Sequence, residues 1–238
     1  MSRRVAVTGA ASGIGAATAK LLAERGWRVA CLDRDLDGAR RTAGDLGLAI
    51  PVDVADEASV IAAFAQVAEA FGGLDALVTA AGVIETVPFL ETTPEQFRRL
   101  FDINVIGSFL SVREGAKAMQ PGARVCMLAS ISSYTGGGYV ATGAYATSKG
   151  AVLTMMKSCA RALGERGIAV NAVAPGFIDT PFVASAMSDP VRREQVKAAV
   201  GKIGSADQIA HTIAWLVSPE AEFIHGETVV ADGGVLMR

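Results

Sequence analysis

The sequence predicts one doubly wound α/β domain over residues 1–238, with helices on both faces of a seven-stranded parallel sheet. The length of 238 residues suits one such domain better than two. Apolar residues make up 51% of the chain and charged residues 19%, as expected when strands are buried on both faces. Short apolar runs alternate with segments of helical periodicity, which predicts crossover helices between parallel strands. These seven runs are residues 5–7, 28–32, 48–52, 74–79, 124–129, 168–174 and 228–231.

Charge, cysteines and histidines exclude several classes of function. The net charge of −2 and the scattered basic residues give no footprint for nucleic acid. Cys31, Cys126 and Cys159 lie far apart in apolar runs, which favours reduced core thiols in a cytoplasmic protein. His211 and His225 lack the carboxylate cluster of a metal site, so we expect no metal. We also expect no membrane span and no signal peptide, because no apolar run is long enough.

The first strand leads directly into a glycine-rich turn and then a helix. Residues 8–15 read TGAASGIG, and apolar residues follow at helical spacing over 16–25. Glycines let the backbone approach a pyrophosphate, and the free N–H groups of a helix N-terminus favour its charge. This order predicts a dinucleotide site, and a tight turn without a ligand is the alternative. The spacing is Gly-x-x-x-Gly-x-Gly instead of the better-known Gly-x-Gly-x-x-Gly.

The second strand ends at Asp33, which bears on the choice of dinucleotide. An acidic residue about 20 positions past the glycine turn can accept hydrogen bonds from the adenosine ribose. It would also repel a 2′-phosphate, so Asp33 argues for NAD over NADP. Arg34 argues the other way, because it could stack on adenine or meet a phosphate. Asp35 is better placed than Asp33 to cap the next helix.

Two further stretches place helices and polar groups. Asp56 is placed to cap the third crossover helix, and Thr93-Pro94-Glu95-Gln96 has the pattern of a capping box. We expect the helix that begins there to run through Asn104. An Asn in a helix interior is mildly unfavourable and therefore needs a reason. Ser205 and Gln208 predict another capped helix near the C-terminus.

The fifth strand ends in Ser130-Ile131-Ser132-Ser133, and Tyr145 and Lys149 follow. A hydroxyl at the carboxyl end of a central strand can stabilise charge on a substrate carbonyl oxygen. The i, i+4 spacing of Tyr145 and Lys149 places both side chains on one face of a helix. A nearby positive charge favours ionised tyrosine, whose unperturbed pKa is about 10. We therefore expect Lys149 to lower the pKa of Tyr145, which makes this phenol a proton donor and acceptor.

Together, the turn at 8–15 and Tyr145-x-x-x-Lys149 resemble the signature of the short-chain dehydrogenase/reductase family, over about residues 5–234. The resemblance implies a Rossmann-like fold and hydride transfer between NAD(H) and a secondary alcohol or ketone. It implies that Tyr145 moves the proton and that Lys149 lowers its pKa and binds the nicotinamide ribose. The backbone carbonyl of Asn104 is expected to hold a water against this lysine. Ser130 is expected to polarise the substrate oxygen.

Ser132 stays an alternative to Ser130. The position relative to the strand end favours Ser130, whereas the usual family separation of thirteen residues from Tyr145 favours Ser132. We prefer Ser130, since the register of a strand is stiff and the glycines at 136–138 could absorb two inserted residues.

The resemblance also implies contacts with the cofactor. Asp53 is expected to meet the adenine amino group, Val54 to pack on the ring, and Thr180 to lie near the carboxamide. Ser12 supports NAD, because relatives that use NADP often carry a basic residue there. At Thr79 and Ala80 the family usually has one or two Asn, which puts in doubt a hydrogen bond that steadies the central sheet. The complete expected set is Gly9, Ser12, Gly13, Ile14, Gly15, Asp33, Arg34, Asp53, Val54, Ala80, Ala81, Gly82, Tyr145, Lys149, Pro175, Gly176, Ile178 and Thr180.

By the same resemblance we expect a homo-oligomer, dimer or tetramer, and a substrate lid at about residues 181–203. The expected substrate pocket is mostly apolar, and its residues are Ile84, Glu85, Ser132, Tyr139, Val140, Phe182 and Met187. It suits a small alcohol or ketone without identifying it. Two alternatives stay open. One is an NADPH-dependent reductase of 3-oxoacyl thioesters, against which Asp33 argues. The other is a dinucleotide-sensing module without chemistry, against which the complete set of reacting groups argues.

Overall fold

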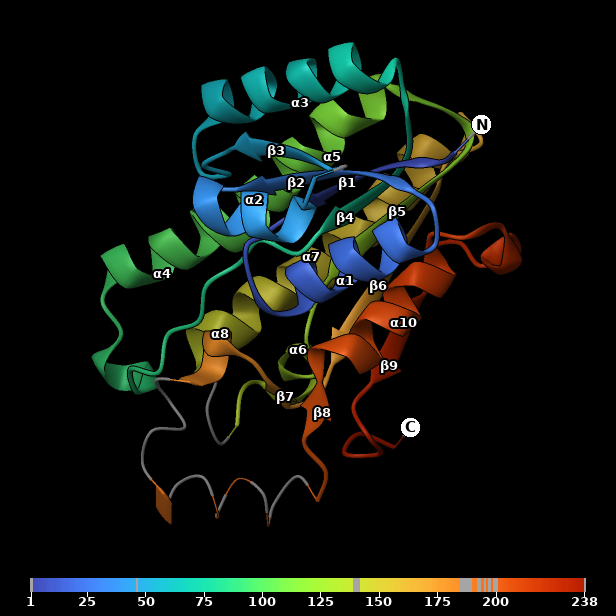
Figure 1. The fold of residues 1–238 in the computed structure, drawn as a ribbon. Helices are drawn as coiled ribbons and strands as arrows, with labels where there is room; N and C mark the ends of the chain where they lie inside the picture. Colours follow the sequence, from blue (N-terminus) through green and yellow to red (C-terminus); the bar gives the residue numbers. More distant parts are fainter. Residues whose placement is uncertain are drawn as a thin grey trace.

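The centre of the computed structural model is a seven-stranded parallel sheet in the order β3-β2-β1-β4-β5-β6-β9 (Figure 1). Residues 2–45, 47–138, 142–184, 190–191, 194, 196, 198 and 201–237 are described. The strands are β1 (Arg4–Thr8), β2 (Arg28–Asp33), β3 (Leu48–Pro51), β4 (Leu74–Thr79), β5 (Met119–Leu128), β6 (Ala169–Pro175) and β9 (Thr228–Ala231). The strand order reverses between β1 and β4. In open α/β sheets, ligands bind in the crevice at such a reversal, next to the carboxyl ends of the strands. The predicted fold class is confirmed.

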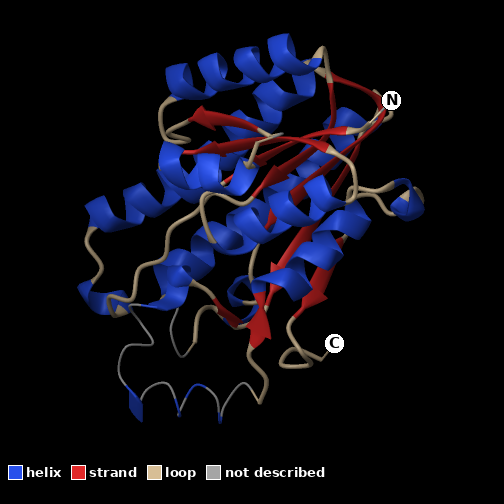
Figure 2. Cartoon of the chain, viewed as in Figure 1, coloured by secondary structure: helices blue, strands red, loops and turns tan. Residues whose placement is uncertain are grey.

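Helices cover both faces of the sheet (Figure 2). On one face lie α1 (Gly13–Glu24), α2 (Leu36–Ala43) and α10 (Ala206–Leu216). On the other face lie α3 (Glu57–Phe71), α5 (Gly107–Lys117) and α7 (Gly143–Gly164). The shorter helices are α4 (Pro94–Phe101), α6 (Ser132–Thr135), α8 (Pro181–Ala184), η1 (Phe89–Glu91) and η4 (Pro219–Ala221). Of these, η4 lies at the amino ends of the strands, where the carbonyl of Ala221 accepts a hydrogen bond from Arg124 of β5.

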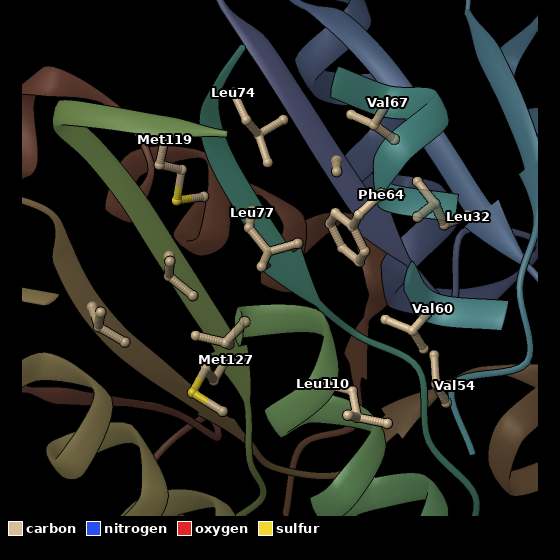
Figure 3. Packing of buried hydrophobic residues seen from close by; sticks show 14 of the residues in the cluster. Leu32, Val54, Val60, Phe64, Val67, Leu74, Leu77, Leu110, Met119 and Met127 are labelled. Atoms are coloured by element: carbon tan, nitrogen blue, oxygen red, sulfur yellow. The ribbon is translucent and has the colours of Figure 1, made fainter. Parts of the chain in front are cut away.

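Alternate residues of the strands fill two separate cores. In β1, Ala6 packs toward α3 and α5, whereas Val5 and Val7 pack toward α1 and α10. Figure 3 shows the first core, in which Phe64 of α3 points toward Leu77 of β4. Each fully buried Val, Leu or Phe side chain of these cores contributes about 1.5–3 kcal/mol to stability. These cores fix the strand register and therefore the positions of the strand ends.

The cysteines are part of these cores. Cys31 and Cys126 are buried, Cys159 is half-buried, and all three are free thiols. Burial raises the pKa of Cys31 to about 11 and that of Cys126 to about 12. Both buried thiols therefore stay protonated at neutral pH, as expected for core residues.

Caps predicted from the sequence are present at three helices. The carboxylate of Asp56 accepts a hydrogen bond from the second residue of α3. Thr93 and Gln96 form a reciprocal capping box at α4, and Ser205 and Gln208 form another at α10. Each cap satisfies N–H groups that a helix start otherwise leaves without partners.

The helix predicted to run through Asn104 is interrupted by a π-helical turn, Asp102–Ile106, between α4 and α5. The N–H of Gly107 donates to the carbonyl of Asp102, five residues back. A side chain at Gly107 would not fit, because an added Cβ would lie 2.8 Å from Cγ2 of Val54. Such turns are rare and are frequent at functional sites. Here the turn accompanies the fully buried position of Asn104.

A second, two-stranded sheet was not predicted. β7 (Ile178–Asp179) pairs in parallel with β8 (Gly204–Ser205). The pairing joins the residues on either side of the segment expected to form a lid, and residues 185–189, 192–193, 195, 197 and 199–200 of that segment lie outside the described residues. Within the described part of the chain, no helix has the length and apolarity needed to cross a membrane.

Candidate active site

A cavity of about 480 Å³ opens at the carboxyl ends of the strands. It has the size of a typical small-molecule site. Every residue that the sequence predicts to contact the cofactor lines it, and so do Ser130, Tyr145 and Lys149. Asn104 is the exception among the predicted site residues, because it lies behind the wall of the cavity. The structure thus brings together in one space groups from β1, β2, β4, β5, β6 and α7.

The glycine turn after β1 forms one wall of the cavity. Gly9 has a φ of +70°, and an added Cβ would lie 2.6 Å from the amide nitrogen of Ala81. At Gly15 an added Cβ would overlap the carbonyl oxygen of Gly9. These two positions therefore require glycine for the turn itself.

The start of α1 fits an anionic group. Its N-cap Ser12 has extended backbone, and among the described residues its side chain makes no cap hydrogen bond. Within the described residues, the first N–H groups of α1 have no side-chain partner, whereas a side chain caps the start of α2, α3, α4 and α10. Such groups, together with the helix dipole, bind phosphate. The residues present therefore fit the pyrophosphate of a dinucleotide.

The carboxylate of Asp33 holds the glycine turn in place. Its Oδ2 accepts a hydrogen bond from the N–H of Ala11 at 2.9 Å, and its Oδ1 accepts one from the N–H of Asp35 at 2.9 Å. Each carboxylate oxygen can accept a further bond, so both stay able to meet a ribose hydroxyl. Arg34 lines the same part of the cavity and is exposed. Asp33 thus has a structural role that the sequence did not predict.

The residues expected at the adenine follow β3. The Oδ1 of Asp53 accepts a hydrogen bond from the N–H of Ala55 at 3.0 Å, as a turn residue does. Asp53 is exposed, whereas Val54 is buried beside Gly107. Both line the cavity, so the carboxylate and the apolar side chain are available to one ligand.

The turn after β4 has Thr79 and Ala80 at the positions where the resemblance implies one or two Asn side chains. The hydroxyl of Thr79 is buried, and within the described part of the chain it has no hydrogen-bond partner. The turn is instead joined to β1 through Thr8, whose carbonyl accepts from the N–H of Ala80 at 3.2 Å. The Thr8 hydroxyl accepts from the N–H of Ala81 at 3.3 Å. The backbone thus holds the turn, and Thr79 adds no side-chain bond to it.

Asn104 joins this turn to α7 from behind. Its Oδ1 accepts a hydrogen bond from the N–H of Val83 at 2.8 Å, and its Nδ2 donates to the carbonyl of Val83 at 3.0 Å. Nδ2 also donates to Oγ of Ser148 at 3.0 Å, and this hydroxyl donates to the carbonyl of Tyr145 at 2.7 Å. The backbone carbonyl of Asn104 accepts from the hydroxyl of Ser108 at 2.8 Å. Asn104 thus positions the first turns of α7.

Lys149 is buried at the base of the cavity. Its Nζ donates to the carbonyl of Leu128 at 2.8 Å and lies 5.9 Å from the centroid of the Tyr145 ring. Burial lowers the pKa of Lys149 to about 8. A small residue at 82 gives the ammonium room, since an added Cβ on Gly82 would lie 3.5 Å from Nζ.

Tyr145 has a pKa opposite in direction to the expectation. Burial raises the pKa of this phenol to about 12, and the Ser130 hydroxyl opposes the rise. The prediction that Lys149 lowers the pKa of Tyr145 below its ordinary value is therefore wrong for the protein without a cofactor. Tyr145 is only 6% exposed, and the loss of water around the phenolate outweighs the hydrogen bond with Ser130, which acts in the opposite direction. At neutral pH the phenol is therefore protonated.

The structure favours Ser130 over Ser132 as the hydroxyl beside the phenol. Both serines are buried and line the cavity. The Ser130 hydroxyl influences the pKa of Tyr145 and accepts a hydrogen bond from the N–H of Ser132 at 3.1 Å. This bond holds the Ser130 side chain in place at the end of β5.

The expected substrate pocket is present in part. Ile84, Ser132 and Phe182 line the cavity, and the ring of Phe182 lies 6.1 Å from that of Tyr145. Glu85 does not line the cavity, because it forms an ion pair with Arg99 at 2.6 Å. Tyr139, Val140 and Met187 lie outside the described residues. Twelve further residues line the cavity and were not among the expected cofactor or pocket residues, and they are Val52, Val83, Ile103, Leu128, Ala129, Ile131, Thr135, Gly137, Gly138, Phe177, Val183 and Val235.

The two histidines lie away from the cavity. Nδ1 of His225 accepts a hydrogen bond from the N–H of Val170 at 3.2 Å, and Nδ1 of His211 pairs with the carbonyl of Asp207. Over the described ranges, no group of three or more His, Cys, Asp or Glu could hold a metal ion. Both histidines have structural contacts.

Comparison with known proteins adds independent findings. A protein-family model described as enoyl-(acyl carrier protein) reductase matches residues 9–236. A cis-4-hydroxycyclohexanecarboxylate dehydrogenase from Sinomonas cyclohexanicum is 38% identical over 98% of this chain and 96% of its own length. A 2-(R)-hydroxypropyl-CoM dehydrogenase from Xanthobacter autotrophicus is 39% identical over 98% of each chain. A solved Brucella melitensis structure, described as a short-chain dehydrogenase/reductase of the glucose/ribitol dehydrogenase kind, has a TM-score of 0.92. It is 31% identical over 99% of this chain and 97% of that chain.

Proposed function

Since the chain belongs to the short-chain dehydrogenase/reductase family, we propose that it transfers hydride between NAD(H) and a secondary alcohol or ketone. One observation carries the proposal. Tyr145, Lys149 and Ser130 line the same cavity as the glycine turn that fits a dinucleotide. A binding module would need only the turn, whereas proton transfer at a carbonyl oxygen needs the three side chains as well.

In this proposal the residues of the chain divide the chemistry of the oxygen atom. A bound nicotinamide supplies hydride donor and acceptor chemistry. Ser130 donates a hydrogen bond to the substrate oxygen and stabilises the charge that develops there. Tyr145 is protonated at neutral pH, because its pKa is about 12, and it gives its proton to a ketone oxygen as that ketone is reduced. To oxidise an alcohol, Tyr145 must accept a proton, which requires a lower pKa of its phenol. A positive charge next to the Tyr145 ring would lower this pKa.

Lys149 would help to hold the cofactor at this site. Its Nζ is held by the carbonyl of Leu128, which leaves further N–H groups to bind a ribose hydroxyl. Asn104 acts indirectly, by positioning other residues. Its hydrogen bonds to Val83 and Ser148 fix the turn after β4 and the helix α7, which carries Lys149. We propose that its backbone carbonyl also holds a water near this lysine.

For the cofactor we propose NAD over NADP, on the position of Asp33. Its carboxylate is held at the end of β2 by the N–H groups of Ala11 and Asp35, so it would face the 2′ position with a fixed negative charge. A second candidate is favoured by Arg34, which lines the same part of the cavity and could pair with a 2′-phosphate. That candidate is an NADPH-dependent reductase of 3-oxoacyl thioesters.

One experiment separates these proposals. NADH and NADPH are titrated into the protein while cofactor fluorescence is followed, and a panel of secondary alcohols and ketones is then screened at the nicotinamide absorbance. We expect tighter binding of NADH and turnover of neutral ketones. Tighter binding of NADPH with turnover of a 3-oxoacyl thioester would favour the second candidate. Cofactor binding without turnover of any substrate would favour a dinucleotide sensor.

Three further proposals concern the location of the protein, its assembly and its lid. We propose that the protein acts in the cytoplasm, that it assembles as a dimer or tetramer, and that residues 181–203 form a lid over the substrate. The side chains available to such an interface include Phe109 of α5, which is 42% exposed. Sedimentation velocity would give the oligomeric state directly.

A further inference from the structure

Residues 232–236, after β9, form a tight bend, here called the hook, which is held by the carboxylate of Asp232. Its Oδ1 accepts a hydrogen bond from the N–H of Gly234 at 2.8 Å, and its Oδ2 accepts one from the N–H of Leu236 at 2.6 Å. Asp232 is 9% exposed, so these bonds are largely shielded from water. They hold the backbone on both sides of Val235, which limits the directions that its side chain can take.

The hook is packed against the turn that follows β6. The N–H of Gly176 donates to the carbonyl of Ala231 at 3.0 Å, and an added Cβ on Gly176 would lie 2.7 Å from Cα of Asp232. Gly233 and Gly234 have φ of +72° and +90°, a conformation that favours glycine. The sequence Asp-Gly-Gly therefore builds one defined bend, visible in Figure 1 as the loop between β9 and the C-terminus.

Val235 reaches the cavity from the end opposite to the dinucleotide's expected adenosine. Asp33, at the end of β2, and Asp53, just after the edge strand β3, line the cavity toward one edge of the sheet. Val235 follows β9, the strand at the other edge, and lines the same cavity as Tyr145 and Phe182. Its side chain is apolar and the residue is 37% exposed. It therefore presents a fixed apolar wall at the end of the cavity where the substrate would lie.

We propose that Val235 is a specificity-determining residue that limits the size of the apolar part of the substrate. The inference rests on the proposed function, because it places the substrate beside Tyr145. The hook makes the wall rigid, so the size of side chain 235 decides how large a neutral alcohol or ketone can be. Adding or removing one methylene in such a pocket changes specificity about 10-fold or more.

The test compares Val235→Ala and Val235→Phe with the wild type on 2-butanone, cyclohexanone and 4-tert-butylcyclohexanone. For each ketone, kcat/KM is measured, and its affinity for the NADH complex is measured by cofactor fluorescence. Met237→Ala is the matched control, since residue 237 lies on the same tail and is 88% exposed. We expect Val235→Phe to lower kcat/KM for the bulky ketone relative to 2-butanone by about 10-fold, and Val235→Ala to raise it. The Kd of NADH and the preference of the control should stay within about twofold of wild type.

An unchanged preference in both Val235 variants would overturn the inference, and so would an equal change in Met237→Ala. Failure of the proposed function has a different signature. If the wild type turned over no ketone, the proposed reaction would be wrong. The affinities of the NADH complex for the three ketones would still show whether side chain 235 limits their size.

Discussion

Replacing Lys149 by Met should change how the free energy of unfolding depends on pH. Burial lowers the pKa of Lys149 from 10.5 to about 8, whereas the unfolded chain restores the ordinary value. Between these two values the unfolded state binds more protons than the folded state. The stability of the wild type therefore rises with pH through this window, because the cost of the buried charge disappears as the folded amine loses its proton. Met has a similar length and no charge, so the variant should lack this rise.

The magnitude follows from the two pKa values. The gap between 10.5 and about 8 corresponds to about 3 kcal/mol. Only part of it falls between pH 7 and 9.5, where the wild type should gain about 2 kcal/mol relative to Lys149→Met. The variant also leaves the carbonyl of Leu128 without its donor, at a cost of about 1–3 kcal/mol. That cost is the same at each pH and does not affect the slope.

Urea unfolding at several fixed pH values, followed by circular dichroism, measures this slope. Lys157→Met is the matched control, since Lys157 is an exposed residue of the same helix. We expect the control to follow the wild type. Parallel stability curves for the wild type and Lys149→Met would refute the reasoning, because they would mean that the buried amine keeps its ordinary pKa.

Three further predictions concern the serine, the glycine turn and the buried amide. Ser130→Ala should lower kcat about 100-fold and Ser132→Ala less than about tenfold, as measured by steady-state kinetics; the reverse order would assign the hydroxyl role to Ser132. Gly9→Ala should abolish NADH binding and lower the free energy of unfolding well beyond the about 1–2 kcal/mol expected for Gly26→Ala. Both glycines have positive φ, but an added Cβ meets backbone only at Gly9, so equal losses would contradict the packing argument. Asn104→Ala should cost about 2–4 kcal/mol in urea unfolding, because three side-chain hydrogen bonds are lost; a cost near zero would mean that the amide does not position α7.

Much of the fold could be predicted because its signals are local. Each strand is a short apolar run, and caps such as Thr93 and Ser205 mark helix starts within four residues of sequence. The π-helical turn at Asp102–Ile106 has no such local signal. At its end, Gly107 packs so closely on Val54 that an added Cβ would lie 2.8 Å from Cγ2 of Val54, and the chain makes this contact only after folding. The pairing of Ile178–Asp179 with Gly204–Ser205 involves two residues on each side, too few to leave a pattern.

The site shows the same division. The glycine turn and Asp33 could be located because the carboxyl ends of parallel strands meet at one edge of the sheet. The Tyr145–Lys149 pair could be located because residues four apart lie on one face of a helix. The direction in which the pKa of Tyr145 shifts could not be predicted, since it depends on how deeply the phenol is buried. Spacing along the helix does not encode that depth. Val235 was missed for a related reason. Only the bend at Asp232 brings the end of the chain to the cavity, although Asp-Gly-Gly was a visible turn signal.

The central claim is that the phenol of Tyr145 transfers the proton at the substrate oxygen. The most direct test is Tyr145→Phe, which keeps the ring and removes only the hydroxyl, measured by NADH titration and by turnover of a ketone that the wild type reduces. We predict that the Kd of NADH stays within about twofold of wild type while kcat falls about 100- to 10,000-fold. Undiminished turnover in this variant would contradict the claim and remove Tyr145 from the mechanism.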